Sequence, residues 1–366
     1  MKNLSYLAVG LIVLSACGSK QKQEVAEETL TPAQTLIAQL NALVADSLIA
    51  FGHHDDLSYG YRWEYQPDSS DVKNVVGDYP AIVNWDLGEI EWGLPRQLDG
   101  VPFDFIRQNA AAHAARGGIN TFSWHPRNPV TKGSAWDTSG DVLSAVLQPG
   151  ELNDSMQIWI GTVADFIGNL RDAEGQRIPV VFRPWHEHTG SWFWWGQDLC
   201  TPEQYKDLWK MTRKVFDERG IDNVVWAYSP DKVSSLEQYM ERYPGDEYVD
   251  VFGADVYYFP DAGKDYFTQM INNDLTYATQ MAKERGKIAA LTETGCEGLP
   301  INDWYCDVLY PAIKDYPIAY ITVWRNAKHD VKPGHFYTPY PGHPAVSDFV
   351  EFYNLPRTAF LQDLPR

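Results

Sequence analysis

Near its middle the chain contains the stretch Val180-Val181-Phe182-Arg183-Pro184-Trp185-His186-Glu187-His188, in which an apolar run passes directly into polar and aromatic residues. A continuous apolar run of this length is typical of a strand in a parallel sheet that is covered on both faces. Side chains alternate along an extended strand, which predicts a common face for Val181, Arg183, Trp185 and Glu187. The stretch therefore predicts a buried strand that presents functional residues at its carboxyl end.

The same arrangement recurs along the chain. Apolar runs that predict strands lie at residues 48–52, 81–85, 119–123, 180–184, 224–227, 251–255, 288–292 and 318–324. Helical patterns separate them, and the clearest lie at 33–45, 103–116, 155–171, 202–219, 266–285 and 303–315. Eight strand–helix units predict a (β/α)₈ TIM barrel in a single domain. A doubly wound open sheet is the rival fold, but no Gly-x-Gly-x-x-Gly motif opens the first unit.

Polar and aromatic residues follow nearly every predicted strand. They are His53 to Asp56, Trp85-Asp86, Trp124-His125, Arg183 to Glu187, Tyr228, Asp255 to Tyr258, Thr292-Glu293 and Trp324-Arg325. A barrel enzyme builds its active site from the carboxyl ends of many strands, whereas an open sheet concentrates its site at one switch point. The distribution favours the barrel.

Composition limits the partners of this 366-residue chain, whose formal net charge is −19. Such an acidic protein has no basic footprint for nucleic acid and repels anionic polysaccharides. The chain has 14 Trp, 21 Tyr and 15 Phe, which suit ligands that present C–H faces and hydroxyl groups. Composition therefore favours a neutral carbohydrate partner.

Two glutamates stand out because each follows an apolar strand. Glu187 follows the fourth predicted strand and Glu293 follows the seventh. Glycoside hydrolysis requires one protonated acid at the leaving oxygen and one ionised carboxylate at the anomeric carbon. Arg183 and Tyr257 are candidates to keep one carboxylate ionised, and a dry tryptophan-lined wall would keep the other protonated.

These motifs resemble those of a known family. Arg183-Pro184-Trp185-His186-Glu187, followed by Gly190-Ser191-Trp192-Phe193-Trp194-Trp195-Gly196, resembles the signature of glycoside hydrolase family 26, and Leu291-Thr292-Glu293 resembles its second motif. The similarity covers roughly residues 33–355. It implies a retaining clan A barrel, most often a β-1,4-mannanase, that needs neither metal nor cofactor.

The resemblance also assigns roles. It implies that Glu187 is the acid/base and Glu293 the nucleophile. It implies that His186 contacts the sugar at the cleaved residue, that Tyr257 hydrogen-bonds to Glu293, and that His125 and Trp324 line the subsite of that sugar. Trp192 should stack near the acid/base, and Arg325 should reach a hydroxyl group one sugar further out. His188 departs from the family pattern, which bears on contacts on the leaving-group side.

The preferred interpretation is a mannan-cleaving enzyme that releases mannobiose or longer products. The sequence also leaves other interpretations open. His53-His54-Asp55-Asp56 with His125 and His186 is compatible with a metal hydrolase, although no His-Glu-x-x-His motif is present. A β-1,3-xylanase or mixed-linkage β-glucanase would share the fold and both glutamates, and Arg325 and His186 favour mannan. A non-catalytic glycan-binding lipoprotein would explain the aromatic residues but not the paired glutamates. Segments 88–101 and 328–343 are candidates to close one end of a sugar-binding cleft.

The N-terminus has the features of a secretory signal. One lysine precedes a short apolar run that ends in Leu14-Ser15-Ala16-Cys17. This sequence resembles a bacterial lipobox, which predicts a signal peptide over 1–16, lipidation of Cys17, a flexible tether over 17–32 and a catalytic domain over 33–366. We expect a monomer anchored by lipid in the cell envelope, at the outer membrane and facing the periplasm. Cys296 and Cys306 are close enough in sequence to form a disulfide, and free thiols are equally compatible with the pattern.

Overall fold

The computed structural model describes residues 30–328 and 330–365. The predicted signal peptide, Cys17 and nearly all of the tether lie outside the described residues. The compact unit begins at Thr31. Helix α1 (Pro32–Ala45) starts with a capping box, because the Thr31 side chain accepts a bond from the Gln34 backbone and the Gln34 side chain accepts one from the Thr31 backbone. The folded domain therefore starts slightly before the predicted boundary at residue 33.

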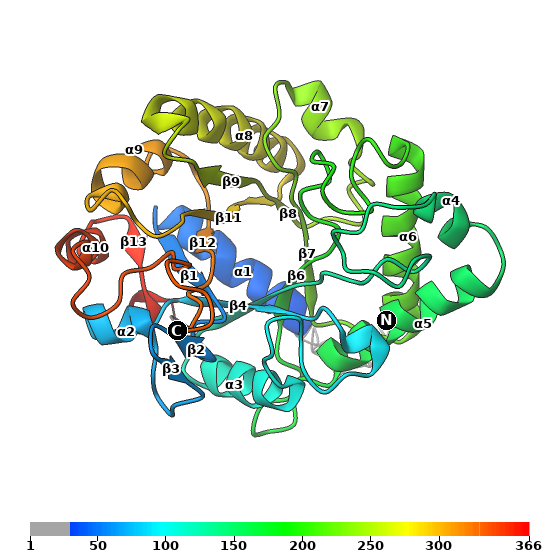
Figure 1. The fold of residues 1–366 in the computed structure, drawn as a ribbon, viewed down its shortest axis with the longest axis horizontal. Helices are drawn as coiled ribbons and strands as arrows, with labels where there is room; N and C mark the ends of the chain where they lie inside the picture. The colour runs from blue at the N-terminus through cyan, green and yellow to red at the C-terminus, as the bar shows by residue number, and fades with distance from the viewer. Residues whose placement is uncertain (1–29, 329, 366) are drawn as a thin grey trace, which may run out of the picture. The chain divides into compact units, whose positions relative to one another are not determined.

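The strands form a parallel barrel, as the sequence predicted (Figure 1). Its members are β1 (Ile49–His54), β4 (Ile82–Asp86), β5 (Ile119–Ser123), β6 (Val180–Arg183), β7 (Val224–Tyr228), β8 (Val251–Phe252), β9 (Asp255–Tyr258), β10 (Ile288–Ala289), β11 (Leu291–Cys296) and β12 (Tyr320–Val323). The ring closes because β8 pairs with both β7 and β10, β9 pairs with β11, β11 pairs with β12, and β12 pairs with β1. The fold is a (β/α)₈ barrel in which the sixth and seventh strands are each divided in two.

The division of these two strands differs from the predicted continuous runs. The sixth is interrupted at Gly253, where an added Cβ would lie 2.5 Å from the Thr292 hydroxyl oxygen. The absence of a side chain at Gly253 therefore lets Thr292 of the neighbouring strand approach closely. As a second difference, β11 continues to Cys296, so that Glu293 lies inside a strand and not behind its end.

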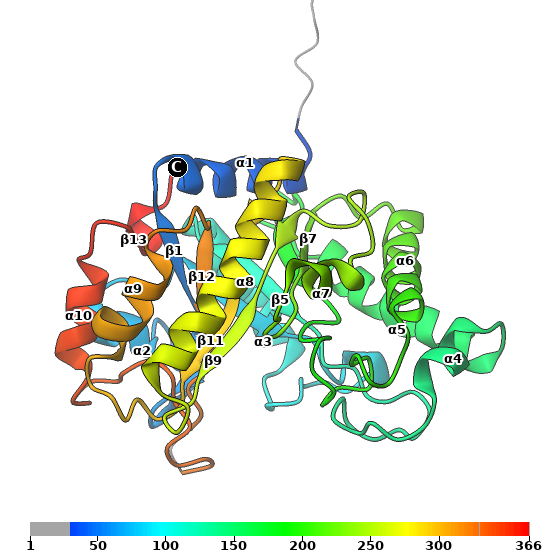
Figure 2. The same ribbon diagram turned by 90° about the horizontal axis from the view of Figure 1, so that it is seen from above.

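Helices surround the strands (Figure 2). They are α2 (Asp71–Val76), α3 (Phe103–Ala115), α4 (Val142–Leu147), α5 (Glu151–Gly168), α6 (Pro202–Glu218), α7 (Leu236–Glu241), α8 (Gly263–Arg285), α9 (Tyr310–Ile313) and α10 (Val346–Tyr353). The helix predicted over 303–315 is a π-helical turn (Trp304–Leu309) that leads into α9. Short elements complete the chain: the hairpin β2 (Tyr59–Gly60) and β3 (Trp63–Glu64), β13 (Thr358–Ala359), and the 3₁₀ turns Ile90–Trp92 and Leu361–Asp363. Within the described residues, no helix is both long and apolar enough to cross a membrane.

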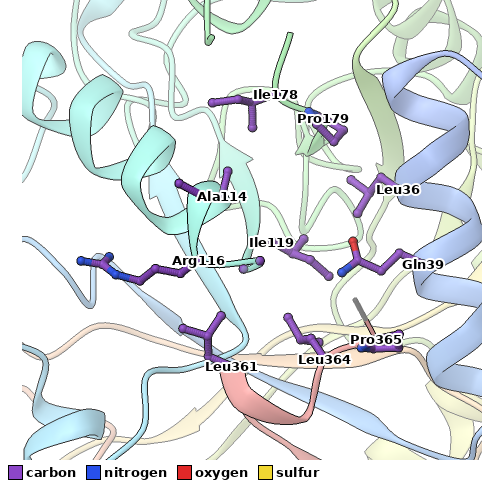
Figure 3. Close-up of a pocket in the computed structure, with 13 residues that line it drawn as sticks. Leu36, Gln39, Ala114, Arg116, Ile119, Ile178, Pro179, Leu361, Leu364 and Pro365 are labelled. Carbon is purple, nitrogen blue, oxygen red and sulfur yellow. The ribbon is translucent and has the colours of Figure 1, made fainter. Parts of the chain in front are cut away.

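Helix α1 covers the amino-terminal end of the barrel (Figure 2). Its buried residues Leu36, Leu40 and Leu43 pack with strand residues such as Ala50 and Val225 that point into the barrel. A cavity of about 570 Å³ lies beside this helix (Figure 3). Its lining includes Ile119, the first residue of β5, so it opens at the end of the barrel opposite to the strand-end residues described below.

We expect Leu40→Ala to lower the free energy of unfolding by about 2–5 kcal/mol, because Leu40 is fully buried between α1 and the barrel and its removal leaves a cavity. Chemical denaturation measures the change. Ile158→Ala is the matched control, since the Ile158 side chain on α5 is 65% exposed and should change stability by about 0.5 kcal/mol or less. Equal effects of the two substitutions would contradict the packing of α1 against the barrel.

Candidate active site

The chain changes direction sharply after β6. Pro184 lacks a backbone N–H and cannot extend the strand ladder. Trp185 and Glu187 then adopt left-handed backbone conformations, with φ of 54° and 53°. The Glu187 backbone N–H donates to the Ser229 carbonyl over 2.7 Å, which fixes this turn above the end of β7. The turn presents the Glu187 side chain at the carboxyl end of the barrel.

This turn overturns the predicted common face of Val181, Arg183, Trp185 and Glu187. Val181 packs inside the barrel, whereas Trp185 lies in the outer core and donates from Nε1 to the Thr212 hydroxyl of α6 over 3.1 Å. Side-chain alternation holds only within the strand, and β6 ends at Arg183, so it does not apply to Trp185 and Glu187.

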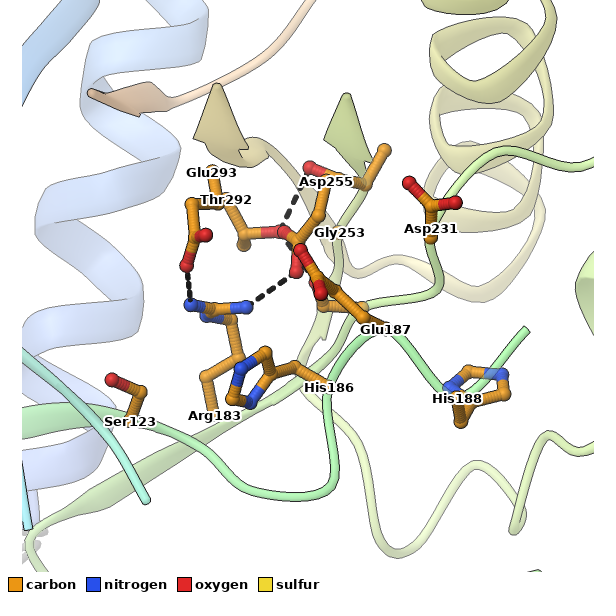
Figure 4. A network of polar contacts seen from close by, with 12 residues as sticks. Ser123, Arg183, His186, Glu187, His188, Asp231, Gly253, Asp255, Thr292 and Glu293 are labelled. Carbon is orange, nitrogen blue, oxygen red and sulfur yellow. Dashed lines mark hydrogen bonds and ion pairs between the residues drawn. The ribbon is translucent and has the colours of Figure 1, made fainter. Parts of the chain in front are cut away.

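Arg183 is the centre of a buried ionic network (Figure 4). Its Nη1 pairs with Asp255 Oδ2 at 2.5 Å, and its Nη2 pairs with Glu293 Oε2. Asp255 and Glu293 face each other in register on the parallel strands β9 and β11. Three strands that are far apart in sequence thus bring one cation and two anions together inside the barrel mouth.

Glu293 is held on both sides. Tyr257 Oη donates to Glu293 Oε1 over 2.6 Å, which is the contact that the family resemblance implies, while Arg183 pairs with Oε2. Tyr257 donates a hydrogen bond to the carboxylate, and Arg183 places a positive charge beside it. Glu293 therefore has the surroundings that a carboxylate nucleophile requires.

Glu187 has the opposite electrostatic surroundings. Burial and the nearby Glu293 and Asp255 carboxylates raise the pKa of Glu187 well above its usual range, against the opposing effect of Arg183. Trp192 Nε1 donates to Glu187 Oε2 over 2.7 Å. Trp192 therefore lies beside Glu187 through a hydrogen bond of its indole ring, and its stacking on a sugar stays a prediction. A carboxyl group that keeps its proton beside an ionised carboxylate can act as an acid.

The predicted histidines lie on the β5 side of the site. His125 Nδ1 lies 2.6 Å from Asp86 Oδ2, and its Nε2 lies 3.1 Å from His186 Nε2. Burial and Arg183 lower the pKa of His186 well below its usual range, which keeps its ring neutral. Trp136, 49% exposed, stacks on His125 with ring centroids 5.2 Å apart.

Trp324 and Arg325 follow β12. The Trp324 ring lies against His54 at 4.2 Å and within 6.4 Å of His125, so it belongs to the same cluster. Arg325 Nη2 pairs with Asp99 Oδ1 at 2.6 Å. The segments 88–101 and 328–343 therefore approach each other here, and a small cavity of about 100 Å³ lies between Asp99, Arg325 and Val331.

Other sequence expectations have different outcomes. His188 faces away from the glutamates and is buried between Tyr205 and Tyr228, to which its ring nitrogens lie within 3.0 Å, so its departure from the family pattern concerns the core. Cys200, Cys296 and Cys306 are free thiols.

His53 pairs with Asp56 at 2.7 Å, and no group of three or more candidate metal ligands occurs in the part of the chain that the structure describes. The absence of a metal requirement stays a prediction.

Three site residues were not assigned a role from the sequence: Asp86, Trp136 and Asp255. Asp86 and Asp255 belong to the strand-end clusters noted above, so their position was a usable signal. The sequence gives no signal for their partners, because His125 and Arg183 come from other strands. Trp136 lies in a loop without a distinctive pattern around it.

Comparisons with known proteins agree with this geometry. Residues 25–298 match the family model described as glycosyl hydrolase family 26. A solved family 26 β-mannanase from Bacteroides ovatus is 47% identical, with a TM-score of 0.87, over 91% of this chain and 96% of that one. A modular endo-β-1,4-mannanase from Cellulomonas fimi is 33% identical, with a TM-score of 0.81, over 92% of this chain and 77% of that one.

The alignments with curated relatives cover only part of each protein. A mannan endo-1,4-β-mannosidase from Bifidobacterium adolescentis is 30% identical over 302 residues, which are 77% of this chain and 30% of that protein. One from Bacillus subtilis is 29% identical over 57% of this chain and 58% of its own length. The chain thus spans less than two thirds of the length of these curated relatives. The matched model, the closed barrel and the two glutamates at the barrel mouth together show that the chain belongs to glycosyl hydrolase family 26.

Proposed function

We propose that this protein is a retaining glycoside hydrolase that cleaves β-1,4-mannosidic bonds in mannan-type polysaccharides or oligosaccharides. The observation that carries the proposal is that the two glutamates near Arg183 have different surroundings. Glu293 is held by Arg183 and Tyr257, and the pKa of Glu187 is raised. The names of the relatives reported above support mannan as the substrate. The β-1,3-xylanase, mixed-linkage β-glucanase and non-catalytic alternatives gain no support from those names.

In the proposed reaction Glu293 attacks the anomeric carbon while the bond to the leaving oxygen breaks. Glu187 gives its proton to that oxygen, and the sugar becomes an ester of Glu293. Ester formation neutralises Glu293 and so removes one cause, beside burial, of the raised pKa of Glu187. Glu187, which has given its proton to the leaving oxygen, then stays ionised and takes a proton from water. That water attacks the ester, which regenerates both carboxyl groups.

The cluster of aromatic and histidine side chains would bind the sugar at the cleaved bond. Trp324, His125 and His186 lie together on one side of the glutamates, and Trp192 lies at Glu187. Aromatic faces pack against the C–H faces of sugars, while ring nitrogens bond to hydroxyl groups. Arg325 is proposed to reach a hydroxyl group of the next sugar, beside its partner Asp99.

The stereochemical outcome tests the proposal. We expect ¹H NMR of a fresh digest of β-1,4-mannohexaose to show the β-anomer first, because two displacements at one carbon restore the starting configuration. Barley β-glucan and β-1,3-xylan are the comparison substrates. An α-anomer formed first would contradict the double displacement, and faster cleavage of glucan or xylan would contradict the mannan assignment.

We also propose that Cys17 carries a lipid anchor that holds a monomer at the outer membrane, on the periplasmic side. The lipobox-like Leu14-Ser15-Ala16-Cys17 after a short apolar run supports this. Expression in a bacterial host with labelled palmitate should label the wild-type protein and leave Cys17→Ser unlabelled. Cys306→Ser is the matched control and should keep the label. Protease treatment of intact cells distinguishes the periplasmic side, where the protein is protected, from the surface.

A further inference from the structure

Arg183 has two buried counter-ions on neighbouring strands, Asp255 and Glu293. In the proposed reaction one of them, Glu293, becomes an ester and loses its charge. Glu293 and Asp255 are register partners on β11 and β9, so both side chains point to the same part of the barrel interior. The guanidinium of Arg183 reaches both from β6, using Nη1 for Asp255 and Nη2 for Glu293. All three side chains are 5% exposed or less.

Asp255 is held in place by groups other than Arg183. The Thr292 hydroxyl donates to Asp255 Oδ1 over 2.7 Å, and the Asp255 backbone N–H donates to the Pro230 carbonyl over 2.9 Å. The close approach of Thr292 depends on the missing side chain at Gly253. The carboxylate of Asp255 is therefore built into the barrel wall and keeps its position when Glu293 changes its bonding.

We propose that Asp255 is a positioning residue that keeps Arg183 charged, paired and oriented while Glu293 carries the covalent sugar. This inference rests on the function proposed above. In the first step a Glu293 oxygen bonds to the anomeric carbon, the electron pair of the broken bond goes to the leaving oxygen, and that oxygen takes the proton of Glu187. Glu293 is then a neutral ester. Without Asp255 the buried Arg183 would be left as an unpaired cation, which is strongly unfavourable.

The charges around Asp255 agree with this exchange of counter-ions. Several charged and titratable side chains act on Asp255 or share its site. They are Arg183 from β6, Glu187, Tyr205 from α6, Asp231, Tyr239 from α7, Tyr257 from β9, Asp274 from α8, Glu293 from β11 and Tyr320 from β12. Burial raises the pKa of Asp255 to about 7, with Arg183 opposing the rise and Glu293 adding to it. Loss of the Glu293 charge on ester formation therefore favours the ionised form of Asp255 at the moment when Arg183 needs it.

Asp255→Asn tests the proposal on the full-length enzyme with a 2,4-dinitrophenyl β-mannobioside. We expect kcat/KM, which reports ester formation, to fall about 10- to 100-fold. The acid limb of its pH profile should move to lower pH, because Asp255, whose pKa burial raises to about 7, no longer titrates in the variant. Asp348→Asn is the matched control, since Asp348 is a buried carboxyl on α10 that accepts bonds from the Tyr305 and Cys306 backbone N–H groups and not from Arg183. It should lower Tm without moving the acid limb.

Three results distinguish the outcomes. Wild-type enzyme without activity on any β-mannoside would overturn the proposed function and this inference together. Active wild-type enzyme with an unmoved acid limb in Asp255→Asn would overturn this inference alone and leave Asp255 a structural role. If Asp255→Asn does not fold, a crystal structure of wild-type enzyme trapped with a 2-deoxy-2-fluoro-mannoside decides: Arg183 still paired with Asp255 supports the inference, and Arg183 turned away from it overturns it.

Discussion

Glu293→Ala is expected to abolish hydrolysis of both mannan and activated aryl β-mannosides, by about 10⁴-fold or more in kcat. No other carboxylate can replace it at the anomeric carbon, because Asp255 lies behind Arg183 Nη1 and Glu187 is required on the leaving side. Reducing-sugar release and dinitrophenolate release measure the two reactions. The surface substitution Glu151→Ala on α5 serves as the control and should leave both rates unchanged.

Azide adds a stereochemical criterion for Glu293. In Glu293→Ala a small anion can enter the space that the carboxylate vacates and attack the anomeric carbon from that side. We expect azide to restore dinitrophenolate release and to give an α-mannosyl azide, by a single inversion. A β-mannosyl azide from this variant would show that Glu293 is not the nucleophile.

Glu187→Ala is expected to discriminate between leaving groups. Mannan hydrolysis should fall about 10²- to 10⁴-fold, because the leaving sugar oxygen is basic and needs a proton. Release of dinitrophenolate in the first step should be nearly unchanged, since that leaving group departs without acid assistance. Similar losses on both substrates would contradict the acid/base role of Glu187.

The pH profile of Glu187→Ala gives an independent measurement. Burial and Glu293 raise the pKa of Glu187, so the wild-type enzyme keeps its acid proton to higher pH than an ordinary carboxyl group does and loses activity when that proton leaves. The alkaline limb of kcat/KM on manno-oligosaccharides should therefore be present in wild type and absent in Glu187→Ala. Trp192→Phe keeps the carboxyl group but removes the indole donor to Glu187, and should keep an alkaline limb. An alkaline limb of the same position in Glu187→Ala would assign it to another group.

Local sequence determined the number and type of the main elements. The apolar run Val180–Phe182 predicted β6, Thr31-Pro32 predicted the start of α1, and the strand-end glutamates predicted where the site lies. These predictions depend on apolar periodicity and on capping, which act over a few residues. Elements of this kind can therefore be predicted from residues that are close together in the sequence.

Tertiary structure decided what each side chain at those strand ends contacts. The left-handed turn at Trp185 and Glu187 is stabilised by the Ser229 carbonyl from another strand, so alternation along Val181 to Glu187 predicted the wrong face for Trp185. Asp255 became the partner of Arg183 only because β9 pairs with β11 in one register. The sequence alone determined a barrel with two glutamates at its mouth, since strands and their order follow from local patterns. Only barrel closure decided which groups each glutamate contacts, because those groups come together from distant strands.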